Sequence, residues 1–289
     1  MKLLSEARVI VDTHTHLGTY NMLGEKVDVT PDMLIAAMDG AGVDHALAFA
    51  KEHKFPEQGI STENLISALQ KYPQLHAIGT ASPFTLNGKK FHLLKDALKA
   101  HVLHGLKFYT GYERFWPNDR RLHCLYEVLA EAGLPAIFHT GYLWNIIAPK
   151  GLLKYAQPLP IDELAVDFPD LKIVIAHIAN PWIVDAAAVV GRHENVYLDV
   201  SGYFAEFSDP FSEEEVGAFQ SDMAQLHLRI GSLEKLLFAT DWPIESMTEY
   251  VRVTRDLFPE GDVRERFFWK NAAELFRLEF GGANATKSV

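Results

Sequence analysis

The chain has 289 residues, of which 48% are hydrophobic, and this is enough to bury one large core. Its formal net charge of −11, from 27 Lys and Arg against 38 Asp and Glu, argues against nucleic acid or an anionic membrane as a partner. The single cysteine, Cys124, excludes an internal disulfide and a cysteine-based metal site. Charge interrupts the apolar residues after Met1 too early for a secretory segment, so we expect a cytoplasmic protein without a membrane span.

Short apolar runs recur along the chain, and each is followed by a segment with helical spacing. The runs predict strands at residues 8–12, 43–50, 75–80, 105–109, 135–139, 172–177, 195–200 and 235–240. The segments between them predict helices at residues 30–38, 62–71, 91–100, 120–132, 161–167, 181–190, 213–227 and 262–278. Thr30 followed by Pro31 is typical of a helix start, whereas Gly42 and Gly133 stand where helices should end.

This alternation of strands and helices indicates parallel strands joined by right-handed crossovers. A single-domain (β/α)8 barrel over residues 1–280, with a polar tail at 281–289, is the simplest solution. An open doubly wound sheet is the alternative, but the sequence has no glycine-rich phosphate loop after the first strand. Long aromatic segments at 111–118, 142–160 and 203–212 follow predicted strands, so we expect them to surround a pocket.

The position of each histidine relative to its strand separates structural from functional roles, because barrel active sites lie at the C-terminal strand ends. Three histidines begin their strands and are expected to serve stability: His45, His76 and His104. His53 follows the second strand and could line the mouth of the pocket. Four histidines lie at the functional ends of predicted strands: His14, His16, His139 and His177.

His14 and His16 are two residues apart on a strand, so both project to one face and can bind one metal ion. His139, His177 and Asp241 end the fifth, sixth and eighth strands, and closure of a barrel would bring them toward the first strand. A divalent ion bound by such ligands lowers the pKa of water from about 16 toward 7. A nearby base, Asp241 or His177, must then orient the water and later protonate the leaving group.

The chain resembles the amidohydrolase superfamily, specifically the branch that contains aminocarboxymuconate-semialdehyde decarboxylase. The resemblance rests on the His-x-His of the first strand, the strand ends at His139 and His177, Asp199 in the seventh run, Thr240-Asp241-Trp242-Pro243, and residues 271–276. It implies that His14, His16, His139 and Asp241 bind one divalent metal, zinc in the first place with manganese as the alternative. It also implies that His177 is the acid–base histidine, and that the enzyme can form a homodimer.

Lys107 lies inside the fourth predicted strand, where the family has a carboxylated lysine, a glutamate or no ligand. Three interpretations are open: a carboxylated lysine bridging to a second metal, an anchor for a substrate carboxylate, or an interior lysine paired with an acid. Arg114, in the following loop, is a second candidate anion anchor. Asp12 comes early in the first strand and is expected to orient an imidazole of the site.

These features predict a metal-dependent hydrolase that cleaves an ester, lactone or amide in a small, anionic substrate. The same residues would serve a metal-dependent decarboxylase of an unsaturated or aromatic acid, and the motifs do not separate the two. A metal-binding barrel without catalysis is the third possibility.

Overall fold

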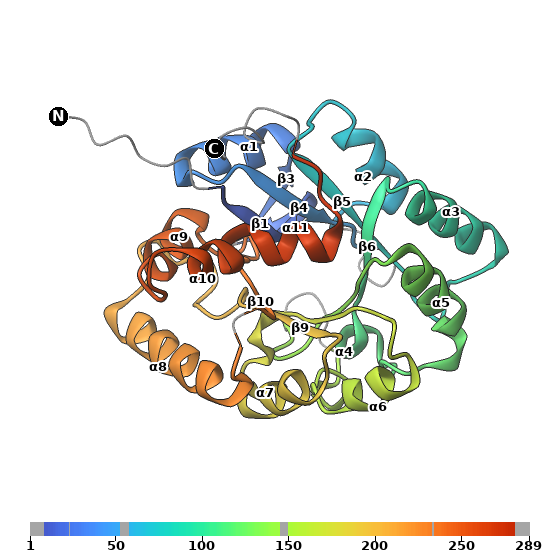
Figure 1. The fold of residues 1–289 in the computed structure, drawn as a ribbon. Coiled ribbons are helices and arrows are strands. Elements are labelled where there is room, and N and C mark those ends of the chain that lie inside the picture. The colour runs from blue at the N-terminus through green and yellow to red at the C-terminus, as the bar shows by residue number, and fades with distance from the viewer. Residues whose placement is uncertain (1–8, 23, 53–57, 145–149, 233, 281–289) are drawn as a thin grey trace, which may run out of the picture.

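The computed structural model describes residues 9–22, 24–52, 58–144, 150–232 and 234–280. Its main sheet has the parallel order β1-β4-β5-β6-β7-β8-β9-β10 (Figure 1). The strands are β1 Val11–His16, β4 His45–Phe49, β5 Leu75–Thr80, β6 Leu103–Phe108, β7 Ala136–Phe138, β8 Ile173–Ile175, β9 Val196–Asp199 and β10 Leu236–Leu237. The segment after β10 returns to β1, because the His16 amide donates to the Trp242 carbonyl at 2.8 Å and the Asp241 amide donates to the His14 carbonyl at 2.9 Å. The predicted single (β/α)8 barrel is confirmed.

Helices surround the strands (Figure 1). The longer ones are α1 Pro31–Ala41, α2 Thr62–Leu69, α3 Gly88–Lys99, α5 His123–Ala132, α6 Pro160–Asp167, α7 Ile183–Arg192, α8 Glu213–Ile230 and α9 Met247–Thr254. As predicted, Thr30 caps α1 by accepting from the Met33 amide, and Gly42 and Gly133 end α1 and α5 with left-handed backbones. No helix among the described residues is long and apolar enough to cross a membrane.

Several short helices complete the chain. They are α4 Thr110–Glu113, α10 Asp262–Glu265, α11 Asn271–Phe276, the 3-10 turns η1 Arg120–Leu122, η2 Leu153–Tyr155 and η3 His177–Ala179, and the π-helix η4 Arg266–Lys270. The long helix predicted at 262–278 is therefore divided into α10, η4 and α11. Helix α9 and helix α4 were not predicted.

The two faces of each strand bury different layers. On β4, Ala46 and Ala48 face the surrounding helices, whereas Leu47 and Phe49 face the barrel interior, as the two-residue period of a strand requires. Helix α11 packs on that interior layer through Leu275 and Phe276 and lies across one end of the strands (Figure 1). The opposite, C-terminal ends of the strands are thus the ends at which a site can open.

An antiparallel hairpin follows β1, formed by β2 (Gly18–Met22) and β3 (Glu25–Val29), and it was not predicted. Gly18 has a φ of 101°, and its α-carbon faces the backbone of Gly59 so closely that any side chain would collide with it. The Thr19 amide donates to the Gly59 carbonyl at 3.3 Å, which ties the hairpin to the loop after β4. The hairpin carries Tyr20, whose side chain is 1% exposed.

The histidines predicted to serve stability lie together at the N-terminal ends of β4, β5 and β6. His45 Nδ1 lies 3.2 Å from His76 Nε2, the His76 and His104 ring centroids are 5.1 Å apart, and His104 Nδ1 lies 2.8 Å from the Phe276 carbonyl. Burial, together with the neighbouring histidines, lowers the pKa of His76 to about 3. His76 is therefore neutral in the folded protein at pH values where the unfolded chain would protonate it.

We expect acid to destabilise the protein partly through His76. Its folded pKa lies below the unfolded value of 6.5, so its contribution to stability is present above pH 6.5 and is lost as the pH falls toward 3. The loss at about pH 5 should be about 2 kcal/mol. In urea titrations, His76→Gln should lose less stability than the wild type between about pH 7 and 5, whereas His92→Gln, an exposed control on α3, should follow the wild type. Parallel losses in wild type and His76→Gln would contradict this role.

Candidate active site

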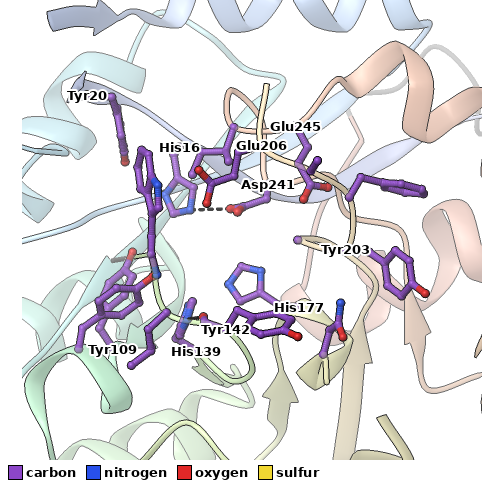
Figure 2. A pocket seen from close by; sticks show the side chains of 18 of the residues that line it. His16, Tyr20, Tyr109, His139, Tyr142, His177, Tyr203, Glu206, Asp241 and Glu245 are labelled. Atoms are coloured by element: carbon purple, nitrogen blue, oxygen red, sulfur yellow. Dashed lines mark hydrogen bonds and ion pairs between the residues drawn. The ribbon is translucent and has the colours of Figure 1, made fainter. Parts of the chain in front are cut away.

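The four histidines and the aspartate predicted from strand ends converge at the C-terminal end of the barrel. His14, His177 and Asp241 can each offer one ligand atom within 4.8 Å of the others. His16 Nε2 lies 2.9 Å from Asp241 Oδ1, as the dashed line in Figure 2 shows. The His139 and His177 ring centroids are 4.5 Å apart. The structure therefore brings all five side chains together at the C-terminal end of the barrel.

Asp199, at the end of β9, connects two of these histidines. Its Oδ2 lies 2.9 Å from His14 Nδ1, and its Oδ1 accepts from the His177 amide at 2.9 Å and from the Ser201 hydroxyl at 2.6 Å. Burial opposes the charged carboxylate, but the charge and hydrogen bond of His14, with Lys107 and Ser201, lower the pKa of Asp199 to about 2. An ionised Asp199 fixes His14 Nδ1 as a hydrogen-bond donor, so Nε2 is the ring nitrogen left for a metal ligand bond.

His139 is fixed in the complementary way. Its Nε2 lies 2.9 Å from the Tyr142 carbonyl oxygen, which can only accept, so Nε2 carries the proton and Nδ1 carries the lone pair. Burial and the charge of Lys107 hold the pKa of His139 well below its usual value, and burial lowers the pKa of His16 to about 4 despite the nearby Asp241 carboxylate. Both imidazoles are neutral near pH 7, which is the form that binds a metal.

The backbone at two of the site residues lies in the left-handed region. His177 has a φ of 65° and Asp241 a φ of 66°, a conformation that is costly for residues other than glycine. A β-carbon on Gly202 would lie 2.5 Å from His177 Nδ1, so the close approach of this loop to the His177 ring requires glycine. Such strain persists where the surrounding structure fixes a side chain for function.

Asp12 is fully buried, and its partners differ from the predicted imidazole. Its carboxylate accepts from the backbone amides of His14 at 3.0 Å and Thr240 at 3.1 Å, and from the Thr240 hydroxyl at 2.6 Å. Burial raises the pKa of Asp12 to about 7 despite these hydrogen bonds. Asp12 therefore joins β1 to the segment that carries Asp241, and the expectation that it orients an imidazole is corrected: Asp199 does so.

Lys107 is fully buried on the interior face of β6. Its Nζ lies 3.2 Å from His14 Nε2 and 5.1 Å from the centre of the Phe49 ring. Burial lowers the pKa of Lys107 to about 7, although Asp199 and Asp241 favour its charged form. Lys107 is absent from the described residues that line the cavity, so a role as substrate anchor is unsupported. The remaining interpretations are a bridging carboxylated lysine and an interior lysine balanced by acids.

A cavity of about 690 Å³ opens beside the histidines. Its walls include His16, His139, His177 and Asp241 together with Tyr20, Tyr109, Tyr112, Tyr142, Trp144, Tyr203, Phe204, Lys51, Glu206 and Glu245 (Figure 2). The predicted aromatic loops after the strands do contribute to this pocket. Its volume suits one small molecule.

Two predictions about the mouth of the pocket have different outcomes. Arg114 is exposed, its guanidinium donates to the Lys150 carbonyl, and it is absent from the cavity walls of the described chain, so the predicted anion anchor at Arg114 is corrected. His53 lies outside the described residues.

No role was predicted from the sequence for four residues of the site: Asp199, Lys51, Tyr20 and Glu245. Asp199 and Lys51 could have been found by the rule that identified the histidines, since each ends or follows a strand.

A family model described as amidohydrolase matches residues 11–278. No curated protein matches the chain. Among solved structures, an uncharacterised TIM-barrel protein, Bb4693 from Bordetella bronchiseptica, is similar at 20% identity with a TM-score of 0.70, covering 93% of this chain and 98% of that one.

Two further similar structures have named activities. A putative 2-pyrone-4,6-dicarboxylic acid hydrolase from Pseudomonas putida is 19% identical with a TM-score of 0.69, covering 94% of this chain and 99% of that one. A 5-carboxyvanillate decarboxylase from Novosphingobium aromaticivorans, complexed with manganese, is 15% identical with a TM-score of 0.68, covering 93% of this chain and 96% of that one.

Proposed function

Because the chain belongs to the amidohydrolase family, we propose that it is a metal-dependent hydrolase that cleaves an ester, lactone or amide bond in a small substrate. The observation that carries the proposal is the convergence of His14, His16, His139, His177 and Asp241 beside a cavity of about 690 Å³. A cytoplasmic location remains part of the proposal.

The donor atoms fit one divalent ion. Asp199 contacts His14 Nδ1 and the Tyr142 carbonyl contacts His139 Nε2, so each ring is fixed through one nitrogen and the other nitrogen is left for a metal. His16 Nδ1 is buried with no hydrogen-bond partner among the described residues, and His16 Nε2 adjoins Asp241. We assign His14, His16, His139 and Asp241 as the ligands. Zinc suits this nitrogen and carboxylate set, and manganese is the alternative.

The bound ion would act as a Lewis acid and would lower the pKa of water, so that a hydroxide nucleophile is available near pH 7. His177 lines the cavity and contacts the Ser201 hydroxyl through Nδ1 at 3.1 Å, so its ring is oriented while facing the substrate space. His177 or Asp241 would accept the proton of the attacking water and return it to the leaving oxygen or nitrogen. The aromatic walls would exclude bulk water around this proton transfer.

Decarboxylation is the second candidate function, because one similar structure is a decarboxylase and the same residues could hold a carboxylic acid and deliver a proton to carbon. A panel of lactones, amides and aromatic or enoic carboxylic acids separates the two. We expect hydrolysis products without carbon dioxide from the metal-loaded protein. Carbon dioxide release without hydrolysis would contradict the hydrolase and establish the decarboxylase.

A further inference from the structure

Glu245 is a buried carboxyl group in the wall of the cavity, and the mechanism above does not use it. Its side chain is 3% exposed, and its Oε2 atom has no hydrogen-bond partner within the described part of the chain. A buried polar atom without a partner costs free energy that a bound ligand can recover. Oε2 therefore marks a point in the wall at which a ligand can form a hydrogen bond.

The surroundings of Glu245 favour its uncharged form. Burial is the largest influence and disfavours the carboxylate. The Tyr250 hydroxyl and the backbone amides of Phe204 and Tyr203 favour the carboxylate, whereas Asp241 opposes a second negative charge nearby. The balance holds the pKa of Glu245 well above its usual value.

The cationic side chain of the cavity lies away from Glu245. Lys51 is the one lysine or arginine among the described residues that line the cavity. Its Nζ lies 5.5 Å from the centre of the Tyr20 ring and 6.0 Å from that of Tyr109. Figure 2 shows Tyr20 and Tyr109 on one side of the cavity, and Glu245 with Tyr203 on the other. A buried carboxyl group that is not paired with a cation keeps its proton.

A neutral carboxyl group has one oxygen that only accepts and one hydroxyl that can donate. Because Oε2 has no partner, the hydrogen bonds that act on Glu245 fall to Oε1, which suits the accepting oxygen. The hydroxyl is then on Oε2, where it is a donor without an acceptor. A substrate that places an oxygen at this point would supply the acceptor.

We propose that Glu245 is a catalytic residue that acts as a neutral acid, with its Oε2 hydroxyl donating a hydrogen bond to an oxygen of the substrate on the Asp241 side of the cavity. This hydrogen bond stabilises negative charge that develops on that oxygen during the reaction. No proton leaves Glu245 in this role, so the proton transfer stays with His177 or Asp241. The inference rests on the proposed function, because it adds a residue to the same site.

Infrared difference spectra of the metal-loaded protein test whether Glu245 is neutral. At pH 7 the wild type should show the carbonyl stretch of a protonated carboxyl group that Glu245→Gln lacks. Glu249→Gln is the matched control, because Glu249 is also buried but accepts from the Phe211 amide at 3.0 Å and from Arg252 at 2.7 Å, and the Arg252 hydrogen bond lowers its pKa. The control should keep the protonated band of the wild type. An ionised Glu245 at pH 7 would overturn the inference.

Two substitutions test whether the donor takes part in the reaction. A glutamine amide can still donate from this position and never ionises, whereas methionine has a similar size and no donor. We expect Glu245→Gln to keep kcat/KM within about fivefold of the wild type, and Glu245→Met to lose about tenfold to hundredfold, mainly in kcat. Metal affinity should stay within about threefold in both, since Glu245 is not assigned as a ligand.

Melting temperatures show whether each variant is folded. Equal rates for folded Glu245→Gln and Glu245→Met, whether both high or both low, would overturn the inference. A loss of about a hundredfold in folded Glu245→Gln would overturn it as well, even if Glu245→Met does not fold, because the role would then require the carboxylate.

The outcomes separate this inference from the proposed function. The rates are measured on whichever member of the substrate panel reacts, so release of carbon dioxide would contradict the hydrolase while the two Glu245 variants still test the donor. An ionised Glu245 in a protein that hydrolyses lactones would overturn the inference and leave the hydrolase intact.

Discussion

Replacing Asp241 by asparagine is expected to lower kcat/KM by about a thousandfold or more for any substrate of this enzyme, with the fold retained. Asp241 Oδ1 lies 2.9 Å from His16 Nε2 and 3.6 Å from His14 Nε2. Burial favours the neutral acid, but the hydrogen bond and charge of His16, with His14 and Lys107, hold the pKa of Asp241 below its usual value. Asparagine keeps the shape but removes the charge that would bind the metal and accept a proton.

The Asp241 backbone should keep its position in the variant, because its amide donates to the His14 carbonyl at 2.9 Å and the side-chain change leaves that bond intact. Steady-state rates and metal affinity, measured with circular dichroism to verify folding, test the expectation. Asp44→Asn is the matched control, since Asp44 lies before β4 at the other end of the barrel and binds the Ile10 amide. A folded Asp241→Asn protein with activity within about threefold of wild type would exclude Asp241 from catalysis.

Replacing Asp199 by asparagine is expected to lower metal affinity by about 10-fold to 100-fold and to lower kcat/KM with it. Both carboxylate oxygens are occupied, one by His14 Nδ1 and the other by the His177 amide and Ser201. An amide has one acceptor oxygen, so one of these donors loses its partner, and Lys107 loses a buried counter-charge. We also expect a loss of about 1–3 kcal/mol in stability.

The pair formed by Asp162 and His193 provides the control for Asp199. Asp162 Oδ1 lies 2.7 Å from His193 Nε2, the same kind of contact as in the site, but on the outer helices. Asp162→Asn should leave metal affinity unchanged. If calorimetric metal titrations gave the same affinity for Asp199→Asn and Asp162→Asn, Asp199 would have no part in orienting a ligand.

The barrel and most of the site could be predicted from local sequence, because short apolar runs in the sequence mark where each strand ends. Parallel strands with short apolar runs carry His139, His177 and Asp241 at their ends, and the barrel rule then brings these ends to one face. The division of the last helix into α10, η4 and α11 depends on how it packs beneath the barrel, which periodicity does not reveal.

The partners of the site residues could not be predicted in this way. Asp199 and His14 are 185 residues apart, and only the closed barrel places Oδ2 beside Nδ1. Asp12 is two residues before His14 in the chain, yet it binds backbone amides, because its side chain points toward Thr240. The β2–β3 hairpin was missed since its residues lack a long apolar run, and with it the contribution of Tyr20. The homodimer stays a prediction.

The metal content of the protein decides the central claim that one divalent ion is held by His14, His16, His139 and Asp241. Protein purified without chelator, analysed for metals, then stripped and reloaded with zinc or manganese, should hold one ion per chain. Its activity should disappear on stripping and return on reloading, and His14→Ala should bind no ion while remaining folded. Two ions per chain would identify Lys107 as a bridging ligand and contradict the single-ion site. Full activity in metal-free protein would contradict the whole mechanism.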